Sequence, residues 1–353
     1  MPLLSWWIYL GCIATSATDR NFYFISGLVV GTLIGSTDFV DGWLARKYGP
    51  TVLGGLLDPI ADKVFIAFAY TPFAASGLIP AWACAAMFVR EFFVTALRSA
   101  YEQRNLTLKT SYLGKAKTWA QMQGIGVMVM FPILGNGSAM RAIIIAGIVT
   151  PIVAMTLLWL IKRKFWRGAL FMSLAFVALY LVNQRNDARL SMNAIMIGIV
   201  AITWISGADY LVVGWRQLRG RGDFGRADAV RLIGAIALPI LLFVALRNTP
   251  LGLWAVLIGL AAELAVGGLD NLLSHHRVAS GALAWGVRVL GAASLLALAV
   301  LAQHFAAIPS AAYFGLLLVA AFISVAGVAR EFWRGRDYYM DKRIRDKAMR
   351  AAG

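Results

Sequence analysis

Long apolar runs, interrupted by short polar or basic segments, make up most of the amino-acid sequence. A membrane-spanning helix needs about 20 predominantly apolar residues. On that criterion the pattern predicts about twelve spans, the first of them short, near residues 4–18, 22–45, 56–77, 79–97, 116–135, 140–161, 166–184, 191–215, 228–246, 251–273, 282–304 and 309–329. The pattern therefore predicts an all-α integral membrane protein.

Composition supports the same class. Of the 353 residues, 60% are hydrophobic and only 14% are charged, whereas a soluble domain is about half apolar and about a quarter charged. This excludes soluble enzymes, DNA-binding proteins and disordered scaffolds. The net charge of +16 is what the positive-inside rule and anionic lipid produce in a membrane protein, so we expect no nucleic-acid partner. Cys12 and Cys84 lie in apolar runs and suggest no disulfide or metal site.

The basic residues also predict orientation and domain organisation. With a cytoplasmic N-terminus, 25 of the 33 Lys and Arg residues fall in connections on the cytoplasmic side and 5 on the opposite side, which fixes the topology. A polar, glycine-containing stretch at 217–228 separates eight spans from four. We therefore expect one domain at 1–219, including two extra spans at about 140–184, and a four-span domain at 226–353.

Four carboxylates stand out because ionisable groups are costly inside an apolar span and are functional candidates there. Asp38 and Asp41 are three residues apart, and Asp58 and Asp62 are four apart, so each pair shares one face of its helix. The connection between the two spans is short. We therefore expect the two helices to pack as an antiparallel pair and their acidic faces to meet.

Four converging carboxylates raise one another's pKa values unless cations neutralise them. Oxygen ligands suit Mg²⁺ or Mn²⁺, so the pattern predicts a divalent-metal site. Gly42 lets a ligand approach the helix backbone, and Ala45 adds only a small side chain to the same face. Arg46 is placed to bind phosphate through its guanidinium group.

The full pattern resembles the signature of the CDP-alcohol phosphatidyltransferase family. It reads Asp38-x-x-Asp41-Gly42-x-x-Ala45-Arg46 and then Gly54-x-x-x-Asp58-x-x-x-Asp62, with seven residues between Arg46 and Gly54 where the commonest form has eight. The resemblance implies a six-helix membrane core, usually a homodimer. It also implies a site for two Mg²⁺ or Mn²⁺ ions and transfer from a CDP-linked lipid to an alcohol with release of CMP.

The same resemblance assigns roles to these residues. Asp38, Asp41 and Asp58 correspond to metal ligands, and Asp62 corresponds to the general base and also lies near a metal. The residues that correspond to nucleotide and diphosphate contacts are Gly42, Ala45, Arg46 and Gly54.

A second motif bears on the acceptor. The run Gly114-Lys115-x-Lys117-Thr118-x-x-Gln121-Met122, downstream of Arg90-Glu91 and Leu97-Arg98, resembles the phosphatidylglycerophosphate synthases of this family. The resemblance implies CDP-diacylglycerol and glycerol 3-phosphate as substrates, with Arg98, Lys115 and Lys117 binding the acceptor's phosphate. The expected location is the cell membrane, with the active site facing the cytoplasm.

Other functions remain open at this stage. The acceptor could instead be inositol phosphate, or phosphatidylglycerol as in cardiolipin synthesis. Membrane carboxylates also occur in divalent-cation transporters. A non-catalytic scaffold is a further alternative, which the C-terminal half alone would fit.

The C-terminal spans weakly repeat parts of the sequence motifs of the first half. Asp270 stands where a motif carboxylate would be, and Arg330-Glu331 repeats Arg90-Glu91, but no Asp or Glu occurs between Asn271 and Arg330. This half therefore lacks the second carboxylate pair. We interpret it as a degenerate copy without the metal site or as a packing and regulatory domain.

Overall fold

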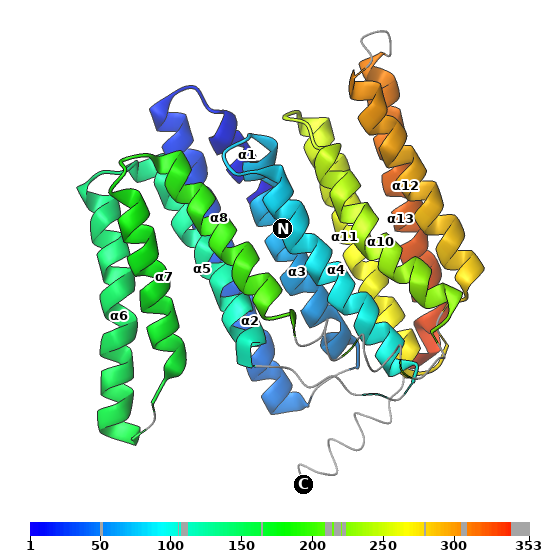
Figure 1. The fold of residues 1–353 in the computed structure, drawn as a ribbon, viewed down its shortest axis with the longest axis horizontal. Coiled ribbons are helices and arrows are strands. Elements are labelled where there is room, and N and C mark those ends of the chain that lie inside the picture. The colour runs from blue at the N-terminus through cyan, green and yellow to red at the C-terminus, as the bar shows by residue number, and fades with distance from the viewer. Residues whose placement is uncertain are drawn as a thin grey trace.

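The computed structural model describes residues 1–49, 52–104, 106, 112–163, 165–208, 214, 220, 224–278, 280–304 and 309–339. These residues form helices and no strands (Figure 1). The helices are α1 (Pro2–Ile13), α2 (Ala17–Tyr48), α3 (Val52–Ala75), α4 (Ala81–Glu102), α5 (Tyr112–Leu134), α6 (Ser138–Lys162), α7 (Arg167–Asn183), α8 (Ala188–Ile205), α10 (Arg226–Val244), α11 (Pro250–His275), α12 (Ala282–His304) and α13 (Ser310–Tyr339).

Seven of these helices are long and apolar enough to cross a membrane, namely α2, α6, α8, α10, α11, α12 and α13. Apolar stretches in α1 and α7 are shorter. Of the remaining helices, α3 and α4 carry motif charges such as Asp58, Asp62, Arg90 and Glu91. The prediction of an all-α, multi-pass membrane protein is confirmed, although seven helices rather than about twelve meet the length and composition criteria.

Helix ends are set by local sequence, and the end of α2 matters most. The Ser16 hydroxyl accepts a hydrogen bond from the Asp19 amide (3.0 Å) and caps the start of α2. The helix then runs for 32 residues and stops at Gly49, whose φ of 86° suits glycine. Asp41 and Arg46 therefore lie within its last eight residues, close to the short connection to α3.

Helix α1 packs against both α2 and α3. The α-carbons of Gly27 and Gly31 in α2 lie against Ile8 and Leu4 of α1. We expected α2 and α3 to pack as an antiparallel pair with their acidic faces meeting. Within the described residues, α1 packs more extensively on each of these helices than they pack on each other, and the meeting of the acidic faces stays a prediction. One direct contact between α2 and α3 is the stacked pair Phe24 and Phe73, with ring centroids 6.0 Å apart.

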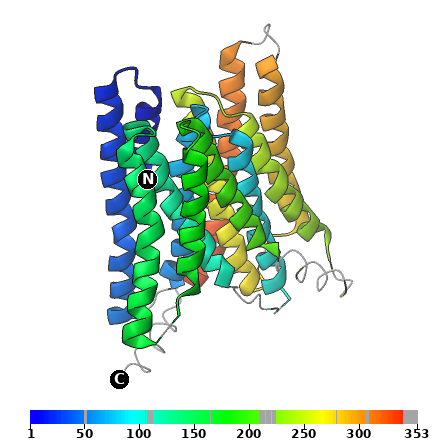
Figure 2. The same ribbon diagram turned by 60° about the vertical axis from the view of Figure 1, so that its left-hand side comes forward.

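The two extra spans fold as a hairpin at one edge of the bundle (Figure 1), and this hairpin comes to the front in Figure 2. Helix α6 packs mainly on α7, and α7 packs on α8. Large apolar side chains of α6, including Val149, Val153 and Leu160, are exposed. In a membrane protein such a surface faces lipid, so the hairpin adds a lipid-facing wall beside α5 and α8.

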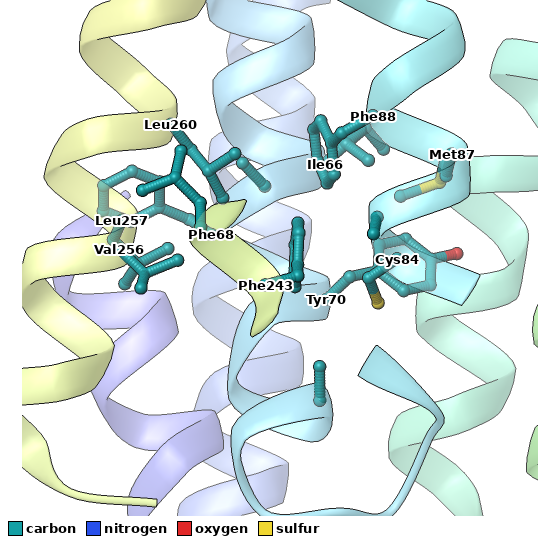
Figure 3. Packing of buried hydrophobic residues seen from close by; sticks show 14 of the residues in the cluster. Ile66, Phe68, Tyr70, Cys84, Met87, Phe88, Phe243, Val256, Leu257 and Leu260 are labelled. Carbon is teal, nitrogen blue, oxygen red and sulfur yellow. The ribbon is translucent and has the colours of Figure 1, made fainter. Parts of the chain in front are cut away.

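The four C-terminal helices pack onto the first half. Helix α11 packs against α3, α4 and α13, and α10 packs against α4 and α12. Figure 3 shows the shared core, in which Phe68 of α3, Phe88 of α4, Phe243 of α10 and Leu257 of α11 lie in one buried cluster. The expected domain division at 219–226 stays a prediction. In space, one apolar core joins the two halves.

Candidate functional site

The first half of the predicted site lies at the end of α2. Asp41 and Arg46 are exposed there, and Gly42 is half-buried. A methyl group placed on Gly42 would meet no atom of the described residues within 4 Å, so among them no helix packing requires this glycine and space is left beside it. The side chains of Asp38 and Ala45 lie outside the described residues.

The second half lies in the first turns of α3. Asp58 is exposed, whereas Asp62, one turn further along, is half-buried. Gly54 is half-buried. A methyl group on Gly55 would meet no atom of the described residues within 4 Å. The two acidic segments are thus carried by consecutive helices at the same end of the bundle (Figure 1).

The donor set fits a hard divalent cation. Neither Asp41 nor Asp58 makes a hydrogen bond or ion pair within the described part of the chain, so their carboxylate oxygens are available as ligands. Among the described side chains, no three His, Cys, Asp or Glu residues form a group that could hold a metal ion. Because the Asp38 side chain is not among them, the set of four carboxylates stays a prediction.

A buried ionic cluster links α4 to α5 and α8. Glu91 of α4 accepts a hydrogen bond from Lys117 Nζ of α5 (2.5 Å) and pairs with Arg90 (3.4 Å). Arg90 also donates to the Ser206 hydroxyl after α8 (3.0 Å). Lys117 was expected in the acceptor phosphate pocket, but in this structure its ammonium group is bound to a buried carboxylate. The Lys115 side chain lies outside the described residues.

The remaining predicted cation, Arg98, lines a cavity of about 270 Å³ between α3, α4 and α11. Lys63 and Thr95 line the same cavity, and Lys63 Nζ donates to Thr95 Oγ1 (2.6 Å). The cavity face of α3, with Pro59 and Lys63, adjoins its acidic face, because successive residues on a helix are about 100° apart. The basic cavity thus lies on a face of α3 next to the face that carries Asp62, although Asp62 itself does not line it.

The C-terminal half forms the far wall of that cavity. Asn271 and His275 of α11 line it, and His275 Nδ1 lies 2.8 Å from Glu102 Oε2 of α4. Nearby, Arg104 pairs with Asp228 at the start of α10 (2.7 Å). These contacts hold α10 and α11 to the end of α4 that carries Arg98.

Sequence reasoning missed Lys63, Asn271 and His275 as candidate site residues. Lys63 follows Asp62 directly, so its place in the motif was a usable signal. Asn271 and His275 carried no such signal, because they come from a segment about two hundred residues away whose position depends on packing.

Comparisons with known proteins bear on this site. The family model of CDP-alcohol phosphatidyltransferase matches residues 2–159. A Sodalis glossinidius protein named CDP-diacylglycerol–glycerol-3-phosphate 3-phosphatidyltransferase is 32% identical over 129 residues, which cover 35% of this chain and 70% of that protein. No solved structure matches the chain.

Two further relatives are similar over a shorter stretch. The Bacillus subtilis protein with the same name is 35% identical over 107 residues, covering 30% of this chain and 55% of that protein. A probable phosphatidylglycerophosphate synthase of Mycobacterium tuberculosis is 38% identical over 112 residues, covering 31% and 53%. The chain therefore spans about half the length of these two curated relatives.

Proposed function

The chain belongs to the CDP-alcohol phosphatidyltransferase family, and we propose that it transfers the phosphatidyl group of CDP-diacylglycerol to sn-glycerol 3-phosphate, giving phosphatidylglycerophosphate and CMP. The observation that carries the proposal is the placement of Asp41 and Asp58, which are exposed and unpaired within the described residues at the adjoining ends of α2 and α3. The names of the relatives supply the substrates.

Asp38, Asp41, Asp58 and Asp62 would hold two Mg²⁺ or Mn²⁺ ions. When bound, such ions neutralise the diphosphate and the charge that develops on the attacking and leaving oxygens. Arg46 binds a phosphate oxygen of the nucleotide, and the open space at Gly42, with Ala45 and Gly54, leaves room for the CDP group.

Asp62 acts as the general base. Its carboxylate accepts the proton of the acceptor hydroxyl as that oxygen forms a bond to the phosphatidyl phosphorus. The bond between this phosphorus and the CMP oxygen breaks, and CMP leaves with the electron pair. Half-burial of Asp62 keeps the carboxylate beside the acceptor and limits competition from water.

The acceptor's phosphate binds to Arg98 with Lys115 and Lys117 nearby. Arg98 supports this role because it lines a cavity and makes no hydrogen bond or ion pair within the described part of the chain. Lys117 contributes less directly, since it is bound to Glu91. Choline and ethanolamine carry no phosphate and would not need these cations.

The site faces the cytoplasm of a cell whose plasma or inner membrane holds the protein. The excess of basic residues at the connections on the motif side supports this orientation. A homodimer, as in the family, would have to use a surface other than the faces of α3 and α4 that α10 and α11 cover.

The deciding experiment measures CMP release by purified full-length protein with CDP-diacylglycerol and Mg²⁺. Parallel reactions contain glycerol 3-phosphate, inositol phosphate, phosphatidylglycerol or no acceptor. Release with glycerol 3-phosphate alone is the expected result. Release with another acceptor would contradict the acceptor assignment, and no release by folded protein would contradict the proposed reaction.

A further inference from the structure

We propose that the C-terminal half takes part in acceptor binding, with a hydroxylated phosphate monoester bound between Lys63 and Arg98 on one side and Asn271 and His275 of α11 on the other. This inference rests on the proposed function and extends it to residues outside the segment that matches the family. The phosphate lies against the two cations, and a hydroxyl of the ligand lies against Asn271.

The cavity has the size for a small ligand. Its volume is about 270 Å³, just below the range of about 300–1,000 Å³ that holds drug-sized molecules. Its walls come from three helices, with the cations on α3 and α4 and the amide and imidazole groups on α11. A three-carbon phosphate ester can therefore contact both walls at once.

The charges of the lining favour an anion. Lys63 uses one of its three N–H donors on Thr95, and Arg98 has no hydrogen-bond or ion-pair partner among the residues that the structure describes. Glu102 is the one acidic residue of the lining, and it is bound to His275. The two cationic groups thus favour a phosphate as the ligand, because Arg and Lys bind phosphate well.

Asn271 supplies the second observation. Its Oδ1 atom is buried and finds no hydrogen-bond partner in the described part of the chain. Buried polar atoms are nearly always hydrogen-bonded in folded proteins, and an unpaired one needs an explanation. Because Asn271 also lines the cavity, its side chain can turn toward the cavity and accept a hydrogen bond from a hydroxyl of a bound ligand. Since the cavity adjoins the acidic face of α3, another hydroxyl of the same ligand can lie near Asp62.

Two glycines bring α11 close enough to form this wall. A methyl group on Gly268 would lie 2.5 Å from Ile60 of α3, and one on Gly267 would lie 3.3 Å from Thr95 of α4. Both glycines precede Asn271 and His275 by one to two turns. The Gly-Gly pair therefore explains why a helix with no metal site of its own is seated against the basic cavity.

The test compares Asn271→Ala and His275→Ala with the wild-type full-length protein, each first shown to be folded by thermal unfolding. Steady-state assays give KM for glycerol 3-phosphate and for CDP-diacylglycerol. Calorimetric titration gives the affinity for glycerol 3-phosphate and for propane-1,3-diol phosphate, which lacks the middle hydroxyl. His276→Ala is the matched control, because His276 neighbours His275 but stacks on Tyr338 instead of lining the cavity.

Asn271→Ala is expected to raise KM for glycerol 3-phosphate about tenfold, as loss of one hydrogen bond implies, with KM for CDP-diacylglycerol unchanged. The variant should also bind glycerol 3-phosphate and propane-1,3-diol phosphate with equal affinity. His275→Ala, whose side chain is 66% exposed, should show a smaller change in the same direction, and His276→Ala none.

Unchanged acceptor KM and unchanged discrimination in folded Asn271→Ala would overturn the inference while leaving the proposed function intact. If the wild type released no CMP, the proposed function would fail, and the calorimetric titration alone would show whether the cavity binds glycerol 3-phosphate. Binding of glycerol 3-phosphate that Asn271→Ala weakens would then still support the site. No binding to the wild type would overturn it.

Discussion

Lys117 Nζ of α5 lies 2.5 Å from Glu91 Oε1 of α4, and both side chains are buried, with 12% and 5% of their surface exposed. Because Glu91 also pairs with Arg90, this carboxylate ties three helices together through Arg90 and Ser206. A lysine from the acceptor motif therefore has a structural partner. The sequence alone could not distinguish a structural role of Lys117 from a role in acceptor binding, and this contact favours the structural role.

Lys117→Met should lower the free energy of unfolding by about 1–3 kcal/mol, because it leaves a buried carboxylate with one partner fewer. Glu91→Gln alone should cost more stability than Glu91→Gln combined with Lys117→Met, because the single change leaves both Lys117 and Arg90 without a carboxylate partner and the double change leaves only Arg90. Thermal unfolding in detergent measures both. A large rise in acceptor KM with unchanged stability in Lys117→Met would show that Lys117 acts on the substrate instead.

Asp62→Asn should reduce CMP release by about 10²- to 10⁴-fold, the usual contribution of a general base, while Mn²⁺ and CDP-lipid binding are partly retained. Asp337→Asn is the control, since Asp337 is exposed near the end of α13 and far from the motif in sequence. Wild-type turnover in Asp62→Asn would remove the base assignment.

Gly42→Leu should raise KM for CDP-diacylglycerol at least about tenfold, which corresponds to about 1.4 kcal/mol, without lowering Tm. The reason is that a Cβ atom on Gly42 would meet no atom of the described residues within 4 Å, so that a larger side chain would occupy the space assigned to CDP. Gly286→Leu in α12 is the matched control, because that helical glycine is equally open. Equal KM values in the two variants would contradict the nucleotide site at Gly42.

Glu263→Gln tests the buried ion pairs of the second half. Glu263 pairs with Arg288 and accepts a hydrogen bond from Ser324 (2.7 Å), so removing its charge leaves a buried guanidinium and should cost about 3–5 kcal/mol of stability. Activity per folded molecule should stay near the wild-type value.

Arg336→Gln serves as the comparison, because its pair with Asp337 is exposed and longer (3.6 Å) and should contribute about 0–1 kcal/mol. Unfolding curves of the two variants that coincide would contradict a stabilising role for the Glu263 pair.

The sequence determined the membrane class and the helical segments, because both depend on local composition and on the length of apolar runs. It also determined which residues of α2 and α3 share a face, since the spacing of Asp41 from Asp38 and of Asp62 from Asp58 is a property of a single helix. The ends of α2 follow from Ser16 and Gly49 in the same local way.

Only the tertiary structure decided what these helices contact. Nothing near Lys117 in the sequence indicates that Glu91 would bind it, and nothing near Asn271 indicates that α11 would form a wall of the cavity beside Lys63 and Arg98. Apolar helices attract one another without direction, so the choice of neighbour depends on the fit of particular side chains, such as Gly268 against Ile60. That fit joins segments far apart in the chain and leaves no local pattern from which it could be predicted.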